Sequence, residues 1–297
     1  MTIAEKVRDW IPPALFRWVR HWIDYIRVAP WKYLPDGWPA EARGWDVDAI
    51  AKVQIERWPA YLAAIQGTAP LGVNLERAEQ RTERVGLWDI FDHNNIVCFA
   101  YALTLASRVK NGVSVLDWGG GVGHYYPLSK ALIPGLAIDY VCHDVPALCR
   151  AGRQLNPEVT FEEDPGACVQ RSYDLVFAGS SLWCHRNWPE VLGKLAHCAD
   201  PYVMVSRMVF IDHGASFVAL QRPRAMGYDT EYPLWIINRN EFLAAARTHG
   251  LRLLREFLIS YGPHIHRAPA QGNYLGFLFE KDTAPPQVRN VHGPSTD

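Results

Sequence analysis

The sequence predicts an α/β protein: a doubly wound, mostly parallel sheet of seven strands, preceded by a helical extension at the N-terminus. Two observations support this fold class. From residue 113 onward, short aliphatic stretches alternate with amphipathic stretches of helical period, which is the pattern of successive βαβ units. The last two aliphatic stretches, 251–260 and 273–280, follow one another without a helix between them. We therefore expect an antiparallel pair of strands at one edge of the sheet.

The individual elements follow from the hydrophobic period and from the positions of glycine and proline. Strands are expected at 113–117, 136–142, 159–162, 173–178, 201–207, 251–260 and 273–280. The helices between them are expected at 124–132, 146–154, 187–197 and 239–249. We expect three parts in the chain, namely a helical extension or cap (1–90), the α/β domain (91–281) and a disordered tail (282–297).

Three further helices are expected before the first strand. The first, within residues 14–28, has a Trp-rich apolar face and a basic polar face, and the prolines after it predict an extended link. The others are expected at 46–66 and 92–110. The first helix could contact an anionic membrane surface, or it could pack on the protein itself or on a partner subunit, for example in a homodimer.

The composition limits the classes of function. A net charge of -1 argues against nucleic-acid binding through bulk electrostatics. The six cysteines include no CxxC pair and no zinc-ligand spacing, so we expect buried, reduced thiols and no metal site. Because the chain has no long apolar run and no signal-peptide layout, we expect a cytoplasmic protein. Peripheral contact with the inner membrane is an alternative that the basic helix leaves open.

Residues 113–123, VSVLDWGGGVG, carry the strongest functional signal in the sequence. A buried strand ends at Asp117 and a glycine turn then leads into a helix, which is the arrangement that holds nucleotide-like ligands. The glycines lie at 119, 120, 121 and 123, so neither the dinucleotide pattern GxGxxG nor a GxxxxGK[ST] phosphate loop is present. The motif that remains is an acid at a strand end followed by GxGxG.

This motif resembles the first motif of class I S-adenosylmethionine-dependent methyltransferases, which have a Rossmann-like sheet whose final strand runs against the others. The resemblance covers residues 90–281 and implies S-adenosylmethionine as the cofactor. It also implies that the acid, the glycine turn and small residues after the fourth strand contact this cofactor. The cofactor-binding residues implied in this way are Asp117, Trp118, Gly119, Gly120, Gly121, Gly123, Gly179 and Ser180.

Two further acids follow the second and third strands. Asp144 comes where the second strand ends, a position from which a carboxylate can accept two hydrogen bonds from a ribose diol. The alternative is that Asp144 caps the helix that begins near Pro146. Asp164 lies in an acidic loop after the third strand, where the resembled family often contacts the adenine amino group. A solvated acidic loop is the alternative for this second residue.

Residues that could serve the methyl acceptor lie in other loops. His185 could remove a proton from an acceptor hydroxyl or amine, because histidine titrates near neutral pH. His213 and Tyr125 could take the same role, and the sequence does not choose among the three. The long segment 207–235 is expected to form a lid over the acceptor, as insertions at this place commonly do in the resembled family. Within it, Arg222 could grip a phosphate or carboxylate of the acceptor.

The sequence thus predicts an S-adenosylmethionine-dependent methyltransferase that acts on an oxygen or nitrogen atom of a small-molecule or glycan-linked acceptor. The run SSLWCHRNWPEVLGKLA (180–196) is similar to that of a group of bacterial methyltransferases linked with surface polysaccharide synthesis. Two alternatives stay open: a nicotinamide-dependent oxidoreductase, and a catalytically idle methyltransferase-like subunit that binds a partner. The absence of GxGxxG argues against the first, and the presence of Asp117 and Asp144 argues against the second.

Overall fold

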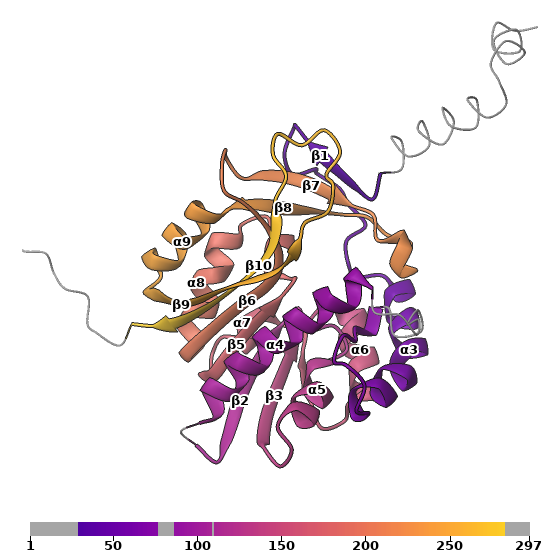
Figure 1. Cartoon of the computed structure of the whole chain (residues 1–297), viewed down its shortest axis with the longest axis vertical. Coiled ribbons are helices and arrows are strands. Elements are labelled where there is room, and N and C mark those ends of the chain that lie inside the picture. The colour runs from indigo at the N-terminus through magenta and orange to yellow at the C-terminus, as the bar shows by residue number, and fades with distance from the viewer. Residues whose placement is uncertain (1–28, 77–85, 109, 283–297) are drawn as a thin grey trace, which may run out of the picture.

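The computed structural model describes residues 29–76, 86–108 and 110–282, and Figure 1 shows them as a curled sheet flanked by helices. Seven strands form the predicted sheet, in the order β4-β3-β2-β5-β6-β10-β9. Their bounds are β2 Gly112–Trp118, β3 Ala137–His143, β4 Thr160–Glu162, β5 Tyr173–Gly179, β6 Ala199–Ile211, β9 Leu251–Tyr261 and β10 Asn273–Lys281. The strands β4, β3, β2, β5 and β6 pair in parallel, which confirms the mostly parallel α/β fold.

The final strand runs against its neighbours. β10 pairs antiparallel with both β6 and β9, so that it lies inside the sheet and β9 forms the outer edge. The predicted antiparallel pair at one edge is therefore confirmed. The central strand β5 reads YDLVFAG and is buried over all but its last residue, because helices cover both faces of a parallel sheet.

Helices pack on the sheet in three groups. α4 (Leu87–Ser107) contacts β5, β6 and β9, and α5 (Tyr125–Leu132) lies beside it. α8 (Trp188–Cys198) and α9 (Arg239–Thr248) contact each other and pack on β6 and β9. α6 (Pro146–Leu155) and the short α7 (Pro165–Cys168) pack near β4. Apart from α7, which was not predicted, these helices match the predicted ones in type and order. They leave the carboxyl ends of the parallel strands open for a ligand.

A small antiparallel sheet extends the large one, and the sequence did not predict it. β1 (Trp31–Leu34), β7 (Phe217–Gln221) and β8 (Tyr232–Asn238) pair in that order. β8 also pairs in parallel with the end of β6, where Phe210 faces Ile237. Much of the segment expected to be a loop-like lid, 207–235, is therefore strand, as is part of the expected extended link. Apolar side chains explain this, because β7 is buried over its whole length.

The helices before the sheet agree with expectation in type. The helix expected at 46–66 is α3 (Asp48–Gln66), which tolerates Pro59 in its interior and packs on α5 and α6 (Figure 1). The helix expected at 92–110 is α4, which begins earlier, where the Gly86 N–H donates to Asp89 at 2.7 Å. The basic helix expected within 14–28 lies outside the described residues, as does the tail expected at 282–297 except for Asp282, whose N–H donates to the carbonyl of Gly250 at 2.8 Å.

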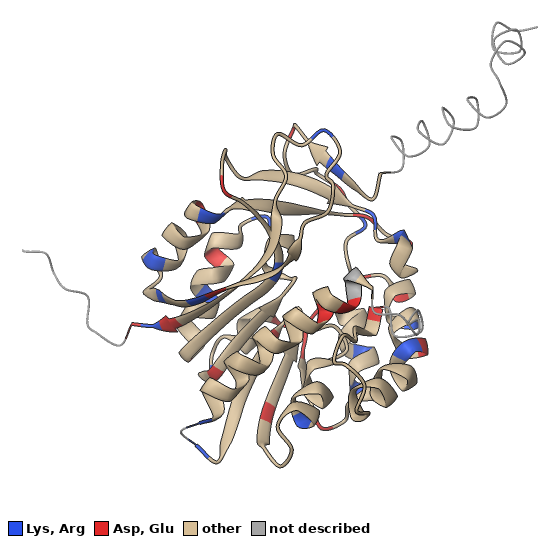
Figure 2. Ribbon diagram, viewed as in Figure 1, with Lys and Arg blue, Asp and Glu red and all other residues tan. Residues whose placement is uncertain are grey.

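The surface charges and the helix lengths bear on the expected partners. On α3, basic and acidic residues are interspersed (Figure 2), and Lys52 pairs with Glu56 at 4.0 Å. Within the described ranges, no helix is both long and apolar enough to cross a membrane. The division into an extension, a domain and a tail stays a prediction, as does peripheral contact with a membrane.

Candidate functional site

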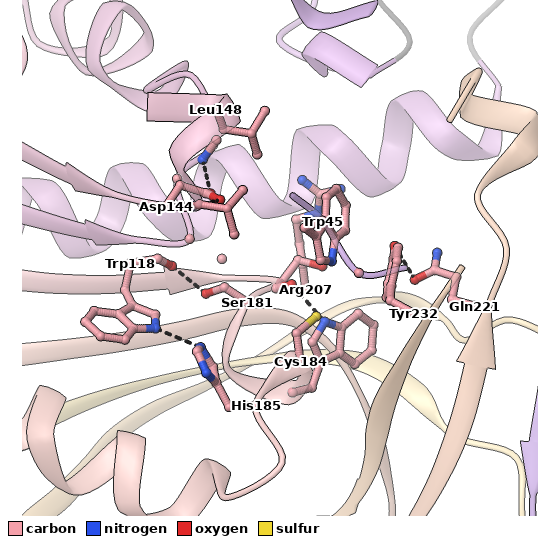
Figure 3. A pocket seen from close by; sticks show the side chains of 18 of the residues that line it. Trp45, Trp118, Asp144, Leu148, Ser181, Cys184, His185, Arg207, Gln221 and Tyr232 are labelled. Atoms are coloured by element: carbon pink, nitrogen blue, oxygen red, sulfur yellow. Dashed lines mark hydrogen bonds between the residues drawn. The ribbon is translucent and has the colours of Figure 1, made fainter. Parts of the chain in front are cut away.

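A cavity of about 530 Å³ opens at the carboxyl ends of β2, β3 and β5 (Figure 3). This is the edge of a parallel sheet where ligands bind in α/β folds, and the volume suits a ligand of the size of a dinucleotide or smaller. Most of the predicted site residues lie in its wall. They are Asp117, Trp118, Gly119, Gly120, Gly121, Tyr125, Asp144, Gly179, Ser180 and His185.

The glycine turn fits its surroundings so closely that side chains are excluded. A Cβ atom on Gly119 would collide with Ser181, and Gly119 also has a left-handed backbone with φ +72°. A Cβ atom on Gly120 would overlap the carboxylate of Asp117 and would lie 2.8 Å from the Sγ atom of Cys142. The turn is tied to the neighbouring strand, because the Gly119 N–H donates to the carbonyl of His143 at 2.8 Å.

Asp117 is buried at the end of β2, with 1% of its surface exposed. Its Oδ2 atom accepts a hydrogen bond from the Tyr140 hydroxyl at 2.8 Å. Burial raises the pKa of Asp117 to about 7, although the bond from Tyr140 lowers it, and the nearby Asp144 carboxylate adds to the rise. An acid whose pKa is perturbed in this way, in the wall of a cavity, is typical of a functional site.

Asp144 holds the glycine turn and keeps capacity for a ligand. Its Oδ2 atom accepts from the N–H of Gly121 at 2.7 Å, and its Oδ1 atom accepts from the N–H of Val145 at 2.7 Å. Each carboxylate oxygen can accept a second hydrogen bond, so a diol can still be bound. Burial raises the pKa of Asp144, while the two N–H bonds oppose this rise. The N-cap of α6 is Val145, not Asp144, so the capping alternative is not what the structure shows.

Three of the predicted residues lie away from the cavity wall. Gly123 packs against Phe161, where a Cβ atom would lie 3.0 Å from the ring. Asp164 is exposed and caps α7, because its side chain accepts from the Gly166 N–H at 2.8 Å. His213 is exposed in the turn that follows β6. We predicted these residues near the ligand because they follow strand ends in the sequence. In the structure, the turns in which they lie direct their backbone or side chains away from the cavity.

Of the three predicted proton acceptors, His185 and Tyr125 line the cavity, and both accept hydrogen bonds from other side chains. The Nε2 atom of His185 accepts a hydrogen bond from the indole N–H of Trp118 at 3.0 Å (Figure 3). Burial lowers the pKa of His185 to about 4, so the ring is neutral at pH 7 and its proton lies on Nδ1. Tyr125 is buried, and its hydroxyl accepts a hydrogen bond from the amide of Asn95. Burial raises the pKa of Tyr125 to about 12.

The outer wall of the cavity is aromatic and comes from segments that are distant in sequence. It is formed by Trp31, Trp38, Trp45, Phe91, Trp183, Tyr232 and Tyr274. The rings of Trp45 and Tyr232 lie 4.5 Å apart, and the Gly44 N–H donates to the carbonyl of Glu231 at 3.2 Å. The segment before α3 and the loop before β8 are therefore joined across the mouth of the cavity. Aromatic rings of this kind suit a ligand with a flat or apolar face.

The polar residues of the wall that the sequence analysis did not identify include Gln54, Glu76, His124 and Arg207. The Oε1 atom of Gln54, the Nδ1 atom of His124 and the Nε atom of Arg207 are buried and make no hydrogen bond within the described structure. Buried polar atoms are rarely left without a partner, so these three indicate a polar ligand. A signal for Gln54 was present, because it interrupts the apolar face of its helix between Ile50 and Trp58.

Arg207 ends the predicted strand 201–207 and has a left-handed backbone with φ +58°. Its guanidinium pairs with Glu76 at 3.3 Å and lies over the ring of Phe91. A non-glycine residue in this conformation is strained, and such strain is commonly found at ligand sites. Arg222, by contrast, binds Glu231 at 2.9 Å and does not reach the cavity wall, so it is not placed to grip an acceptor there.

Comparisons with known proteins give similarity in structure only. No protein-family model matches the chain, and no curated protein matches it in sequence. Among solved structures, the chain is similar to magnesium protoporphyrin IX methyltransferase from Synechocystis PCC 6803 with bound S-adenosylhomocysteine. The identity is 14%, the TM-score is 0.46, and the match covers 79% of this chain and 97% of that chain.

Two further solved structures are similar at the same level. A S-adenosylmethionine-dependent methyltransferase from Methanosarcina mazei is 11% identical with a TM-score of 0.45, over 60% of this chain and 96% of that chain. An O-methyltransferase family protein from Burkholderia thailandensis is 16% identical with a TM-score of 0.40, over 79% of this chain and 70% of that chain. Because the identities are at most 16% and the TM-scores at most 0.46, the assignment of function rests on the site itself.

Proposed function

We propose that this protein is a S-adenosylmethionine-dependent methyltransferase that acts on an oxygen or nitrogen atom of a small-molecule or glycan-linked acceptor. One observation carries the proposal: Asp117, the glycine turn and Asp144 come from adjacent parallel strands and meet in one cavity. The residues present fit the cofactor. Glycines at 119 and 120 leave no room for a Cβ atom, so the backbone of the turn itself lines the cavity, and unpartnered polar atoms line the same wall.

In this proposal the chain holds the cofactor through its strand ends. Asp144 accepts hydrogen bonds from the ribose diol, and the glycine turn packs against the cofactor without intervening side chains. Asp117 is buried below the turn, and a cationic ligand would lower its pKa from about 7, which favours the charged carboxylate. Bound S-adenosylmethionine supplies a methyl group that its sulfonium already activates. The remaining work of the chain is to align the acceptor and to exclude water.

The aromatic wall serves the acceptor in this proposal. The rings of Trp45 and Tyr232 pack on each other in the aromatic wall of the cavity, and an acceptor ring can stack on that wall. His185 is neutral and its Nε2 atom is held by Trp118, so it fixes that indole and offers an Nδ1–H donor. The similarity of residues 180–196 to polysaccharide-linked methyltransferases is what supports a glycan-linked acceptor.

The order of the strands argues against a nicotinamide-dependent oxidoreductase. The dinucleotide-binding fold continues in parallel beyond its fifth strand, in the order 3-2-1-4-5-6. Here the antiparallel β10 takes the place beside β6, and β9 lies outside it. The glycine motif also lacks the third glycine of GxGxxG. An idle methyltransferase-like subunit stays an alternative outcome of the experiment below.

Calorimetric titration with S-adenosylmethionine, S-adenosylhomocysteine and NAD tests the proposal. We expect micromolar binding of both adenosyl ligands, weakened at least tenfold in Asp144→Ala, which corresponds to about 1.4 kcal/mol. Asp164→Ala is the matched control, because that carboxylate lies outside the cavity wall and should leave the affinity unchanged. Binding of NAD alone would favour the oxidoreductase. No measurable binding of any of the three ligands would favour the idle subunit.

A further inference from the structure

We propose that Gln54, on a helix that precedes the βαβ part of the fold, binds the α-ammonium group of S-adenosylmethionine through its Oε1 atom. This inference rests on the proposed function. It assigns a recognition group for the amino-acid end of the cofactor, which neither the glycine motif nor the strand ends had identified.

Gln54 is held so that one end of its amide is satisfied and the other is not. Its Nε2 atom donates to the hydroxyl of Tyr228 at 3.1 Å, and Tyr228 is fully buried. The Oε1 atom of Gln54 is buried without a hydrogen-bond partner, and only 6% of the residue is exposed. A buried carbonyl oxygen in this state is destabilising unless a donor reaches it. Because Gln54 lines the cavity, a ligand can supply that donor.

The position of Gln54 points to the cofactor rather than to the acceptor. A Cβ atom on Gly121 would lie 3.3 Å from the Oε1 atom of Gln54 and 4.0 Å from the Nδ1 atom of His124. Both atoms are unpartnered, so two orphaned polar atoms flank the space above one glycine of the turn. α3 is fixed against this turn, because the Tyr61 hydroxyl donates to the carbonyl of His124 at 2.7 Å.

The charges around Gln54 favour a cationic group. The carboxyl groups of Asp117 and Asp144 line the same cavity, where the charges of Glu76 and Arg207 offset each other in an ion pair at 3.3 Å. A ring nitrogen that carried a positive charge would repel an ammonium, but burial lowers the pKa of His124 to about 3, which keeps this imidazole neutral. In S-adenosylmethionine, the positively charged group that donates hydrogen bonds is the α-ammonium at the amino-acid end. The ribose hydroxyls of the cofactor are already assigned to Asp144.

Titrations with two ligands test this proposal. S-adenosylhomocysteine has the amino-acid end, and 5′-methylthioadenosine keeps the adenosine and sulfur but lacks it. We expect Gln54→Ala to weaken S-adenosylhomocysteine at least tenfold and to change 5′-methylthioadenosine less than threefold. Gln54→Glu should keep the affinity for S-adenosylhomocysteine, because a carboxylate also accepts from an ammonium. Gln66→Ala, an exposed residue on the same helix, is the matched control and should change neither affinity.

Each contrary result has a separate meaning. If the unmodified protein binds neither ligand, the proposed function fails, and the inference about Gln54 fails with it. If the unmodified protein binds both, unchanged binding of S-adenosylhomocysteine to Gln54→Ala would overturn the inference alone, as would an equal loss of both ligands. A tenfold loss of affinity for S-adenosylhomocysteine in Gln54→Glu would also overturn the assignment to the ammonium, because a carboxylate oxygen accepts from an ammonium as an amide oxygen does.

Discussion

The buried Asp117 should make the stability of the free protein depend on pH in an unusual direction. Its pKa is raised from 3.8 to about 7, chiefly by burial. Between these two values the folded protein keeps a proton that the unfolded chain has released. Stability therefore falls as the pH rises through this window, because the native state binds more protons. Asp117→Asn removes this titration and keeps an oxygen that can accept the hydrogen bond from Tyr140.

The size of the effect follows from the shift in pKa. A difference of about three units, at 1.36 kcal/mol per unit, corresponds to about 4 kcal/mol over the whole window. Between pH 5 and pH 8, the free energy of unfolding of Asp117→Asn should rise by about 3 kcal/mol relative to that of the unmodified protein. At about 2 °C per kcal/mol, the difference in Tm should change by roughly 6 °C. The contributions of groups that do not interact with Asp117 cancel in this comparison.

Thermal and urea unfolding of the two proteins, in the absence of cofactor, measure this difference. Asp139→Asn is the matched control, because this acid lies on the neighbouring strand β3 with 57% of its side chain exposed and pairs with Arg171. Its loss should change the free energy of unfolding by less than about 1 kcal/mol. A difference between Asp117→Asn and the unmodified protein that stays constant from pH 5 to pH 8 would refute the raised pKa.

Two further predictions concern the walls of the cavity. Gly120→Ala should reduce the free energy of unfolding, measured by urea denaturation, by about 1–3 kcal/mol, because the new methyl group overlaps the buried Asp117 carboxylate. Gly67→Ala is the control, because the nearest contact of its new methyl group would be at 3.6 Å. Equal losses of stability in the two variants would contradict the reasoning. By NMR, the imidazole of His185 should stay neutral from pH 5.5 to 8, and Trp118→Phe should raise its pKa, because a hydrogen bond to the neutral ring is lost. A titration midpoint above 6 in the unmodified protein would show this environment to be wrong.

Patterns local in sequence were sufficient for the main sheet. Strands such as 173–178 are runs of apolar residues that only a doubly covered parallel strand can bury, and the helices between them have one apolar face. Asp117 and Asp144 could be placed at one edge from sequence alone, because the carboxyl ends of parallel strands share that edge. The antiparallel pair followed from the missing helix between the last two strands.

These local patterns did not predict contacts between segments that are distant in sequence. The small sheet forms because β1 and β8 both pair with β7, across separations that no periodicity encodes. Gln54 was not identified from the sequence, in which it is a polar residue between the apolar Ile50 and Trp58, and only the packing of α3 against the glycine turn places its amide at the cavity. His213 follows a strand that lines the site, but the chain turns away before reaching it.

The sequence by itself thus determined the succession of strands and helices from residue 113 onward, apart from α7, β7 and β8, and the edge of the sheet at which we propose that a ligand binds. Both depend on the period of apolar residues along short stretches, which is set by the geometry of one helix or one strand. The tertiary structure decided which polar atoms reach the ligand. That choice depends on how α3, β6 and the aromatic segment before α3 pack together. Packing buries an atom such as the Oε1 of Gln54 away from water, so that it needs a hydrogen-bond partner, and sequence spacing does not show this.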